Sequence, residues 1–322
     1  MPKKPGECGL NYIIFAVAPD NNQVWSERDI LASVRQRATP TSGIALGIGD
    51  DCAIYRPTPG EELVFTTDFY IEDVHFGFAT HTAAQVGHNA LARGLSDIAA
   101  MGAEPRVCLL SLAIPPHANA RWVKSFYRGL LRLADFTGTA LAGGDLSRAT
   151  KLHCDIVVCG AVPAGTALLR AGANAEDAIY VSGALGGSAL GLATKCGAAW
   201  KRHLHIEPRL RLGRFLRTRL KATACMDLSD GLSLDLNRLC LESKLSAHIR
   251  MPPLFAKASP AQALHGGEDY ELLFTVPPTQ KVPAQFEGLR LTRIGSMEAG
   301  KPGQVLLNGT KLLPAGYDHF RR

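Results

Sequence analysis

The sequence lacks several features that would assign the chain to a familiar class. No apolar run approaches the roughly 20 residues that a helix needs to cross a bilayer, so we expect no membrane partner. The eight cysteines contain no C-x-x-C pair and lie far apart, which argues against a zinc site or a disulfide framework. Most of them sit in apolar runs such as VCLLSLAIP. We therefore expect reduced, buried thiols in a cytoplasmic protein.

The common nucleotide and hydrolase motifs are also missing. There is no G-x-x-x-x-G-K-[ST], which excludes a P-loop, and no G-x-G-x-x-G that opens a helix after a strand. The protein-kinase motif set and G-x-S-x-G are absent too. If the chain is a phosphotransferase, its nucleotide must be held by metals and acidic side chains rather than by a Walker lysine.

The net excess of positive charge is confined to one segment. The 322 residues carry 35 Lys and Arg against 29 Asp and Glu, a net charge of +6. Residues 201–221 hold eight of these cations and one acid, so the rest of the chain is close to neutral. A nucleic-acid-binding surface is one interpretation. However, Leu212, Phe215, Leu216 and Leu220 share one helical face, so we expect the arginines on a solvated opposite face. No aromatic residues are interleaved to stack bases, so we expect no nucleic-acid partner.

The chain has 46% hydrophobic and 20% charged residues, as expected for a globular protein of about two domains. Helix-like and strand-like segments alternate, which predicts an α/β or α+β architecture. Helices are predicted at 27–36, 83–100, 119–136, 187–196 and 208–221. A further helix is predicted to begin at DLSDG (227–231) and to end near residue 240. Strands are predicted at 62–71, 107–114, 140–147, 153–162 and 178–183. We expect a leader without an assigned role over 1–25, an N-terminal domain over 26–162 and a C-terminal domain over 163–322.

Acidic residues recur beside glycines or hydroxyl groups, in GIGDD, TTD, LSD, GGD, DLSDG and GGED. Taken singly, each acid could belong to a turn or cap a helix. Asp97 is the exception, because it shares the apolar face of its predicted helix with Val86 and Ala90. It also lies near the helix C-terminus, where the dipole disfavours a carboxylate, so it needs a cation. Converging acids would bind Mg²⁺, to which Thr66 and Thr67 could add oxygens. The glycine-rich turns suit phosphate groups.

In order along the chain, these segments resemble the thiamine-monophosphate kinase family of the aminoimidazole-ribonucleotide-synthetase-like (PurM-like) superfamily. The resemblance extends from about Ser26 to Phe320. It rests on eight segments, namely GIGDDCAIY (47–55), TTDFYIEDVHF (66–76), LSDIAAMGAEP (95–105), AGGDLSR (142–148), LLRAGA (168–173), DLSDGLSLDL (227–236), GGEDYELLFTV (266–276) and GYDHF (316–320).

The resemblance implies a two-domain PurM-like α/β fold, with N-terminal ATP- and Mg-binding domains that pair in a homodimer. It implies ATP-dependent phosphorylation of thiamine monophosphate to thiamine diphosphate, by direct in-line transfer without a covalent enzyme intermediate. The residues that would bind several Mg²⁺ ions are Asp51, Thr66, Thr67, Asp68, Asp97, Asp145, Asp227 and Asp230, of which Asp145 and Asp230 are the most critical. Those that would contact ATP are Gly144, Asp145, Arg170 and Ser229. Those that would line the thiamine-phosphate pocket are His75, Glu268 and Tyr317.

Three positions depart from the family pattern: Asp73 replaces a commoner glycine, Gly94 a usual asparagine and Gly187 a usual aspartate. The alternative function is that of another PurM-like enzyme. A hydrogenase-maturation enzyme of this superfamily would need a C-terminal cysteine, whereas this chain ends in GYDHFRR. A selenophosphate synthetase would carry a reactive cysteine in a glycine-rich N-terminal loop, and Cys8 lacks that setting.

Overall fold

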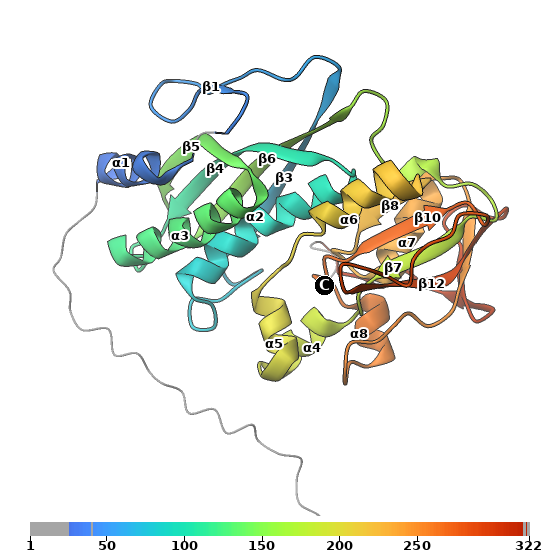
Figure 1. The fold of residues 1–322 in the computed structure, drawn as a ribbon. Helices are drawn as coiled ribbons and strands as arrows, with labels where there is room; N and C mark the ends of the chain where they lie inside the picture. Colours follow the sequence, from blue (N-terminus) through green and yellow to red (C-terminus); the bar gives the residue numbers. More distant parts are fainter. Residues whose placement is uncertain (1–25, 40, 318–319, 321–322) are drawn as a thin grey trace, which may run out of the picture.

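The computed structural model describes residues 26–39, 41–317 and 320, so the predicted leader lies outside the described residues. In the N-terminal half, four strands form a sheet in the order β3-β6-β4-β5 (Figure 1). β3 pairs antiparallel with β6 and β6 with β4, whereas β4 and β5 are parallel. The strands are β3 (Glu61–Ile71), β4 (Glu104–Ile114), β5 (Ala140–Arg148) and β6 (His153–Pro163).

Helices cover one face of this sheet. α2 (Ala83–Ala100) and α3 (Ala120–Thr137) lie against it, and α1 (Glu27–Arg37) packs on α3 (Figure 1). A capping box at Thr82 begins α2, Asn119 caps α3, and Gly138 ends α3 in the left-handed conformation. A small separate sheet, β1 (Ile44–Leu46) with β2 (Ile54–Tyr55), precedes β3.

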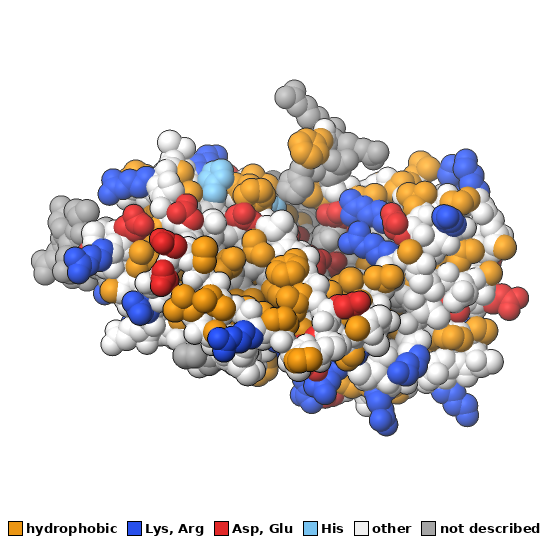
Figure 2. All heavy atoms as spheres, turned by 90° about the horizontal axis from the view of Figure 1, so that it is seen from above, with side chains coloured by type: hydrophobic (Ala, Val, Ile, Leu, Met, Phe, Trp, Pro, Cys, Tyr) orange, Lys and Arg blue, Asp and Glu red, His pale blue; other side chains and the backbone are white. Residues whose placement is uncertain are grey.

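Among the residues that the structure describes, no helix lies on the other face of the sheet, and this face carries exposed apolar side chains. Phe65 is 66% exposed, Phe69 59% and Leu109 40%. In the view from above, hydrophobic side chains gather over the N-terminal half (Figure 2). An apolar sheet face of this kind is typical of an interface with another protein surface.

The C-terminal half contains an eight-stranded sheet in the order β14-β13-β9-β12-β7-β10-β8, with β11 paired to β12. Its strands are β7 (Ala178–Ser182), β8 (Ala224–Asp227), β9 (Ser246–Ile249), β10 (Leu272–Val276), β11 (Gln285–Phe286), β12 (Leu289–Glu298), β13 (Val305–Leu307) and β14 (Thr310–Leu312). Its helical segments are η1 (Arg170–Gly172), α4 (Gly187–Thr194), α5 (Gly197–Leu204), α6 (Leu210–Phe215), η2 (Leu216–Leu220), α7 (Leu232–Glu242) and α8 (Pro260–His265).

Helix α2 joins the two halves. One side of it packs on β3 and β6, while another contacts α6 and β8 of the C-terminal half (Figure 1). The crossing with α6 is close, because a Cβ at Gly213 would overlap the carbonyl oxygen of Ala99. Most of α2 is therefore buried, and its polar side chains lie where the two halves meet.

The basic segment 201–221 differs from the sequence expectation in two ways. Leu212, Leu216 and Leu220 are buried as predicted, but the predicted single helix is α6 followed by a π-helical turn. The arginines are not all solvated: Arg202 and Arg209 both pair with Glu271, which is only 2% exposed. A buried carboxylate needs cations, and the segment supplies them.

Most of the cysteines are buried, as the sequence predicts. Cys108, Cys154, Cys159, Cys225 and Cys240 are buried, and each is a free thiol. Burial raises the pKa of the Cys108 thiol to about 12, so that group is inert. Within the described residues, no helix combines the length and the apolar character that crossing a membrane requires.

Candidate active site between the two halves

The side chain of Asp97 lies between α2 and β3. Thr66 Oγ1 donates a hydrogen bond of 2.5 Å to Asp97 Oδ2. Burial raises the pKa of Asp97, while the Thr66 hydroxyl and the charges of Arg170 and Arg93 lower it. Arg170 and Arg93 are therefore close enough to Asp97 to act on its charge, although the pKa of Asp97 remains raised.

Asp227 brings a second carboxylate to the same place from the C-terminal half. It ends β8, is 3% exposed, and its Oδ2 accepts a hydrogen bond of 2.7 Å from Ser96 Oγ. Burial raises the pKa of Asp227 well above its usual value, and the charge of Asp97 raises it further. On β3, burial raises the pKa of Asp68 to about 6, and Asp97, Asp155 and Asp230 add to this effect although Arg93 opposes it.

Burial is the main cause of the raised pKa values of these three acids, and repulsion between the carboxylates adds to it at Asp68 and Asp227. Desolvated carboxylates that repel one another fit the donor set that Mg²⁺ prefers. In the part of the chain that the structure describes, no three His, Cys, Asp or Glu side chains are already gathered closely enough to hold one ion. The set is therefore rich in oxygen donors but open, as expected where substrate phosphates complete the coordination.

Two loops of the C-terminal half place further predicted residues beside this set. Glu268 N–H donates to Ser229 O at 2.7 Å, and Tyr317 N–H donates to Asp230 O at 2.9 Å. Ser229, Asp230, Glu268 and Tyr317 therefore lie together around one turn. Asp230 also forms an ion pair with Arg238.

Arg93 is the functional candidate that the sequence prediction missed. It lies one helical turn before Asp97 on α2, within hydrogen-bond distance of Glu268 at 3.2 Å. Its guanidinium is 5.5 Å from the ring centroid of Tyr70 and 5.6 Å from that of Tyr270. Among the described residues its Nε has no hydrogen-bond partner although it is buried. The available signal in the sequence is an Arg four residues before an acid on the same helix.

His75 reaches the same cluster through Tyr70. Its ring stacks on that of Tyr70 with centroids 5.7 Å apart, and its Nδ1 accepts a hydrogen bond of 3.0 Å from Ile71 N–H. Arg93 lies over the same tyrosine ring and pairs with Glu268. The side chains of Tyr70 and Arg93 therefore connect His75 to Glu268.

Four predicted residues lie apart from this set within one chain. β3 and β5 are the opposite edges of the four-stranded sheet, so Gly144 and Asp145 are three strands away from Asp68. Successive side chains of a strand point to opposite faces, so Thr67 lies on the uncovered face whereas Thr66 faces α2. There Thr67 Oγ1 donates a hydrogen bond of 2.6 Å to Asp155 Oδ1. Asp145 is exposed and pairs in register with exposed Ser111 on β4. Asp51 is exposed in the turn between β1 and β2.

The three departures from the family pattern have local explanations. Asp73 has φ of +63°, a conformation that favours glycine, and it forms an ion pair with Lys151 at 3.0 Å. A Cβ at Gly94 would lie 2.7 Å from Val158 Cγ2, and one at Gly187 would lie 2.9 Å from Phe255 Cδ2. At both glycines a neighbouring side chain occupies the space that a larger residue would need.

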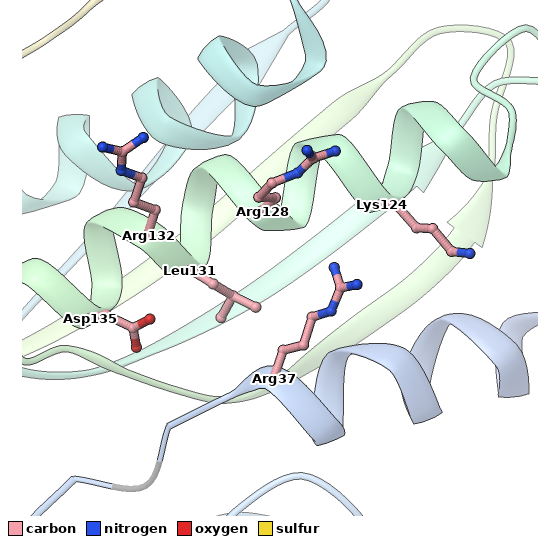
Figure 3. Close-up of a pocket in the computed structure, with 6 residues that line it drawn as sticks. All are labelled: Arg37, Lys124, Arg128, Leu131, Arg132 and Asp135. Carbon is pink, nitrogen blue, oxygen red and sulfur yellow. The ribbon is translucent and has the colours of Figure 1, made fainter.

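A basic groove of about 620 Å³ lies between α1 and α3, remote from the carboxylates just described. Its lining residues are Arg37, Lys124, Arg128, Leu131, Arg132 and Asp135 (Figure 3). It contains none of the predicted site residues, so it is not the candidate active site.

Comparisons with known proteins show the family and the fold of the chain. Residues 49–164 match the model for the AIR synthase related protein N-terminal domain, and residues 174–308 match that for its C-terminal domain. A solved thiamine-monophosphate kinase from Stenotrophomonas maltophilia K279a is 35% identical with a TM-score of 0.78, covering 87% of this chain and 95% of that one. These matches confirm the predicted two-domain PurM-like α/β fold. A hydrogenase maturation protein HypE in complex with ATP shares the fold alone, at 18% identity and a TM-score of 0.73 over 92% of this chain and 96% of that one.

Curated relatives match most of the chain. Thiamine-monophosphate kinase of Bacillus subtilis is 34% identical over 92% of this chain and 99% of its own, and that of Escherichia coli K12 is 37% identical over 86% and 92%. A structure described as AaThiL complexed with AMPPCP and TMP is 31% identical with a TM-score of 0.74, covering 82% of this chain and 89% of that one. With identities above 30% across most of its residues, the chain belongs to the thiamine-monophosphate kinase family.

Proposed function

We propose that the chain transfers the γ-phosphoryl group of ATP to the phosphate of thiamine monophosphate, giving thiamine diphosphate and ADP. One observation carries the proposal: Asp68, Asp97, Asp227 and Asp230 bring carboxylates from both halves to one place, with raised pKa values at the first three. The relative complexed with AMPPCP and TMP supports both the nucleotide and the acceptor.

The proposed reaction brings two anionic phosphates together, so its main requirement is positive charge and alignment. Mg²⁺ bound at the carboxylates would supply that charge between the phosphates. The protein's own part is to hold the ions with acids fixed on β3, α2 and β8. The acceptor phosphate is already ionised at neutral pH, so neither a strong general base nor a covalent enzyme intermediate is needed.

We assign the site residues as follows. The magnesium ligands are Asp51, Thr66, Thr67, Asp68, Asp97, Asp145, Asp227 and Asp230, with Thr67 acting through its carbonyl oxygen. The ATP contacts are Gly144, Asp145, Arg170 and Ser229. The acceptor contacts are His75, Glu268 and Tyr317, with Arg93 holding Glu268 in place through its 3.2 Å contact.

We also propose that the protein is a homodimer formed by the uncovered face of the N-terminal sheet. The exposed Phe65 and Phe69 on β3 and Leu109 on β4 support this interface, because covering water-exposed apolar side chains is favourable. In this proposal residues 26–162 form the ATP-, Mg- and dimer-binding domain, and residues 163–322 complete the active site.

A coupled ADP-release assay with thiamine monophosphate, ATP and Mg²⁺ tests the function. We expect ADP release that depends on both the acceptor and the metal, and thiamine diphosphate as the product by chromatography. Absence of turnover with folded protein under these conditions would disprove the proposal.

A further inference from the structure

The loop that carries Glu268 has an uncommon backbone conformation. Glu268 has φ of +63° and Tyr270 has φ of +48°, in the left-handed region that residues other than glycine rarely adopt. Such a conformation persists only where surrounding contacts fix the chain. Glu268 N–H donates to Ser229 O at 2.7 Å and Tyr270 N–H donates to Leu228 O at 2.9 Å. Asp269, between these two residues, is held by different partners.

The carboxylate of Asp269 lies at the start of α4, in the turn GALGGS. Gly186 N–H donates to its Oδ2 at 2.6 Å, and Ser188 N–H donates to its Oδ1 at 3.3 Å. Ser188 N–H belongs to the first turn of the helix, whose donors have no partner within the helix. Asp269 is only 3% exposed. The glycine-rich turn that suits an anion by its sequence is therefore filled by a carboxylate of the chain itself.

Arg202 on α5 holds the same residue by its backbone. Its Nη2 donates to the carbonyl oxygen of Asp269 and, at 2.7 Å, to Glu271 Oε1. Arg209 pairs with Glu271 at 2.6 Å, so two arginines share one carboxylate that is 2% exposed. A buried polar cluster whose members are paired is rigid. Two cations of the basic segment 201–221 thus fix this loop.

These contacts place the side chain of Glu268 where the two halves of the molecule meet. Its Oε1 lies 3.2 Å from Arg93 Nη1 on α2, and its Oε2 lies 3.6 Å from His203 Nδ1 on α5. Ser188 Oγ is 2.9 Å from the same His203 nitrogen. Because α4 and α5 pack on each other (Figure 1), they hold Glu268 and Asp269 together.

We propose that Asp269 and Arg202 are positioning residues of the acceptor site, which orient Glu268 without touching the substrate. The assignment rests on the proposed function, in which Glu268 contacts thiamine monophosphate. The Asp269 carboxylate faces the N–H groups of α4, whereas the Glu268 carboxylate faces α2 and α5. Loss of either support lets Glu268 shift, and a displacement of about 1 Å in a binding residue is enough to weaken a complex.

The test measures KM for thiamine monophosphate and KM for ATP in the ADP-release assay at pH 8. Burial raises the pKa of Asp269 to about 6, so its carboxylate is charged there. Asp269→Asn keeps the size of the side chain, but its single amide oxygen replaces two carboxylate oxygens. We expect KM for thiamine monophosphate to rise about tenfold, because a charge-assisted hydrogen bond is lost. KM for ATP should change by less than about twofold. Asp135→Asn, at an exposed acid on α3, is the matched control and should leave both values unchanged.

A second series changes Arg202. Arg202→Met should produce the same selective rise in KM for thiamine monophosphate. Arg202→Lys should recover part of it, because lysine keeps the cation but lacks the planar fork that reaches two oxygens. Lys201→Met, at the exposed neighbour on α5, is the control and should behave as wild type. This series carries the test if Asp269→Asn does not fold, as judged by urea unfolding.

A double-mutant cycle separates positioning from a general loss of structure. If Asp269 acts through Glu268, Asp269→Asn should raise KM for thiamine monophosphate by less than about twofold once Glu268→Ala is present. A general loss of structure would raise KM equally with and without Glu268→Ala. The same comparison applies to Arg202→Met.

Two results would overturn the assignment. One is folded Asp269→Asn and Arg202→Met proteins whose KM for thiamine monophosphate stays within about twofold of wild type. The other is an equal rise in KM with and without Glu268→Ala. Either result, with turnover by the wild-type protein, refutes the positioning role alone. Absence of wild-type turnover refutes the phosphotransfer, and the dissociation constant of thiamine monophosphate, measured by calorimetry, then replaces KM in the same comparison. A wild-type protein that does not bind this compound overturns both.

Discussion

Ser96 Oγ donates a hydrogen bond of 2.7 Å to Asp227 Oδ2, and this contact joins α2 of the N-terminal half to the last residue of β8 in the C-terminal half. The next residue on α2, Asp97, accepts from Thr66 on β3. Two adjacent residues of α2 thus connect the carboxylates of Asp97 and Asp227 to side chains of β3 and β8. A rotation of one half against the other would separate Asp227 from Asp97, so the interdomain packing of α2 controls the geometry of the site.

Magnesium should stabilise the protein more at high pH than at low pH. Asp68 has its pKa raised to about 6, and the pKa values of Asp97 and Asp227 are raised as well. Unfolded carboxyl groups titrate near pH 3.9, so the folded, metal-free protein binds more protons than the unfolded chain between these values. Its stability therefore falls as the pH rises through this range.

Bound Mg²⁺ offsets this loss, and at low pH it must displace protons to bind. We expect a larger rise in Tm on replacing EDTA with Mg²⁺ at pH 8 than at pH 5.5, measured by thermal unfolding. The Asp68→Asn, Asp227→Asn variant should show little difference between the two pH values. An equal rise in Tm at both pH values for the wild-type protein would contradict the assignment of these acids as metal ligands.

Removing Arg93 should weaken both the fold and acceptor binding. Its side chain is 12% exposed and balances Glu268 at 3.2 Å. Arg93→Met should lower the free energy of unfolding by about 2–3 kcal/mol, because Glu268 is left without its cation. It should also raise KM for thiamine monophosphate more than it raises KM for ATP.

The matched control is Arg93→Met combined with Glu268→Gln, compared by urea unfolding. The double variant should recover part of the stability, because no carboxylate is then left unbalanced. Additive losses in the two single variants would show that the ion pair contributes nothing to stability.

Restoring the asparagine that the family pattern predicts at position 94 should destabilise this chain. A Cβ there would lie 2.7 Å from Val158 Cγ2, tighter than normal packing allows. We expect Gly94→Asn to cost about 1–3 kcal/mol of unfolding free energy. Gly94→Asn with Val158→Ala should be less destabilised than the sum of the two single changes, as measured by urea unfolding. Full additivity would exclude a steric origin for the departure.

The helix predicted over 83–100 coincides with α2, because its apolar pattern and its cap at Thr82 are local signals. The acids Asp68, Asp97 and Asp227 could be identified because each lies at a marked place in the sequence. The role of Arg93 could not, since it depends on Tyr70, Tyr270 and Glu268 meeting it from distant segments. The buried pairing of Arg202 with Glu271 is likewise set by tertiary packing that charge patterning does not reveal.

Charging the uncovered sheet face should separate the proposed dimer. Phe65 and Phe69 lie four residues apart on β3, so both side chains point to this face. Phe65→Asp with Phe69→Asp should give a monomer by analytical ultracentrifugation, since four acidic groups would oppose one another across a two-fold interface. Leu192→Asp, at an exposed leucine on α4, is the control and should remain dimeric. A wild-type monomer would refute the dimer outright.

Because β3 and β5 are opposite edges of the sheet, we predict that a second copy of the chain completes the active site. Asp145 lies at the opposite sheet edge from Asp68, and pairing through the uncovered face can place β5 of one copy beside β3 of a second. Asp145→Asn and Asp227→Asn should each abolish turnover without unfolding the protein. If Asp145 of one copy serves the Asp227 site of the other, a mixed dimer of the two variants contains one intact site. Co-refolding them should then restore about one quarter of the wild-type activity for statistical pairing. A mixture as inactive as its components would show that Asp145 acts within its own chain.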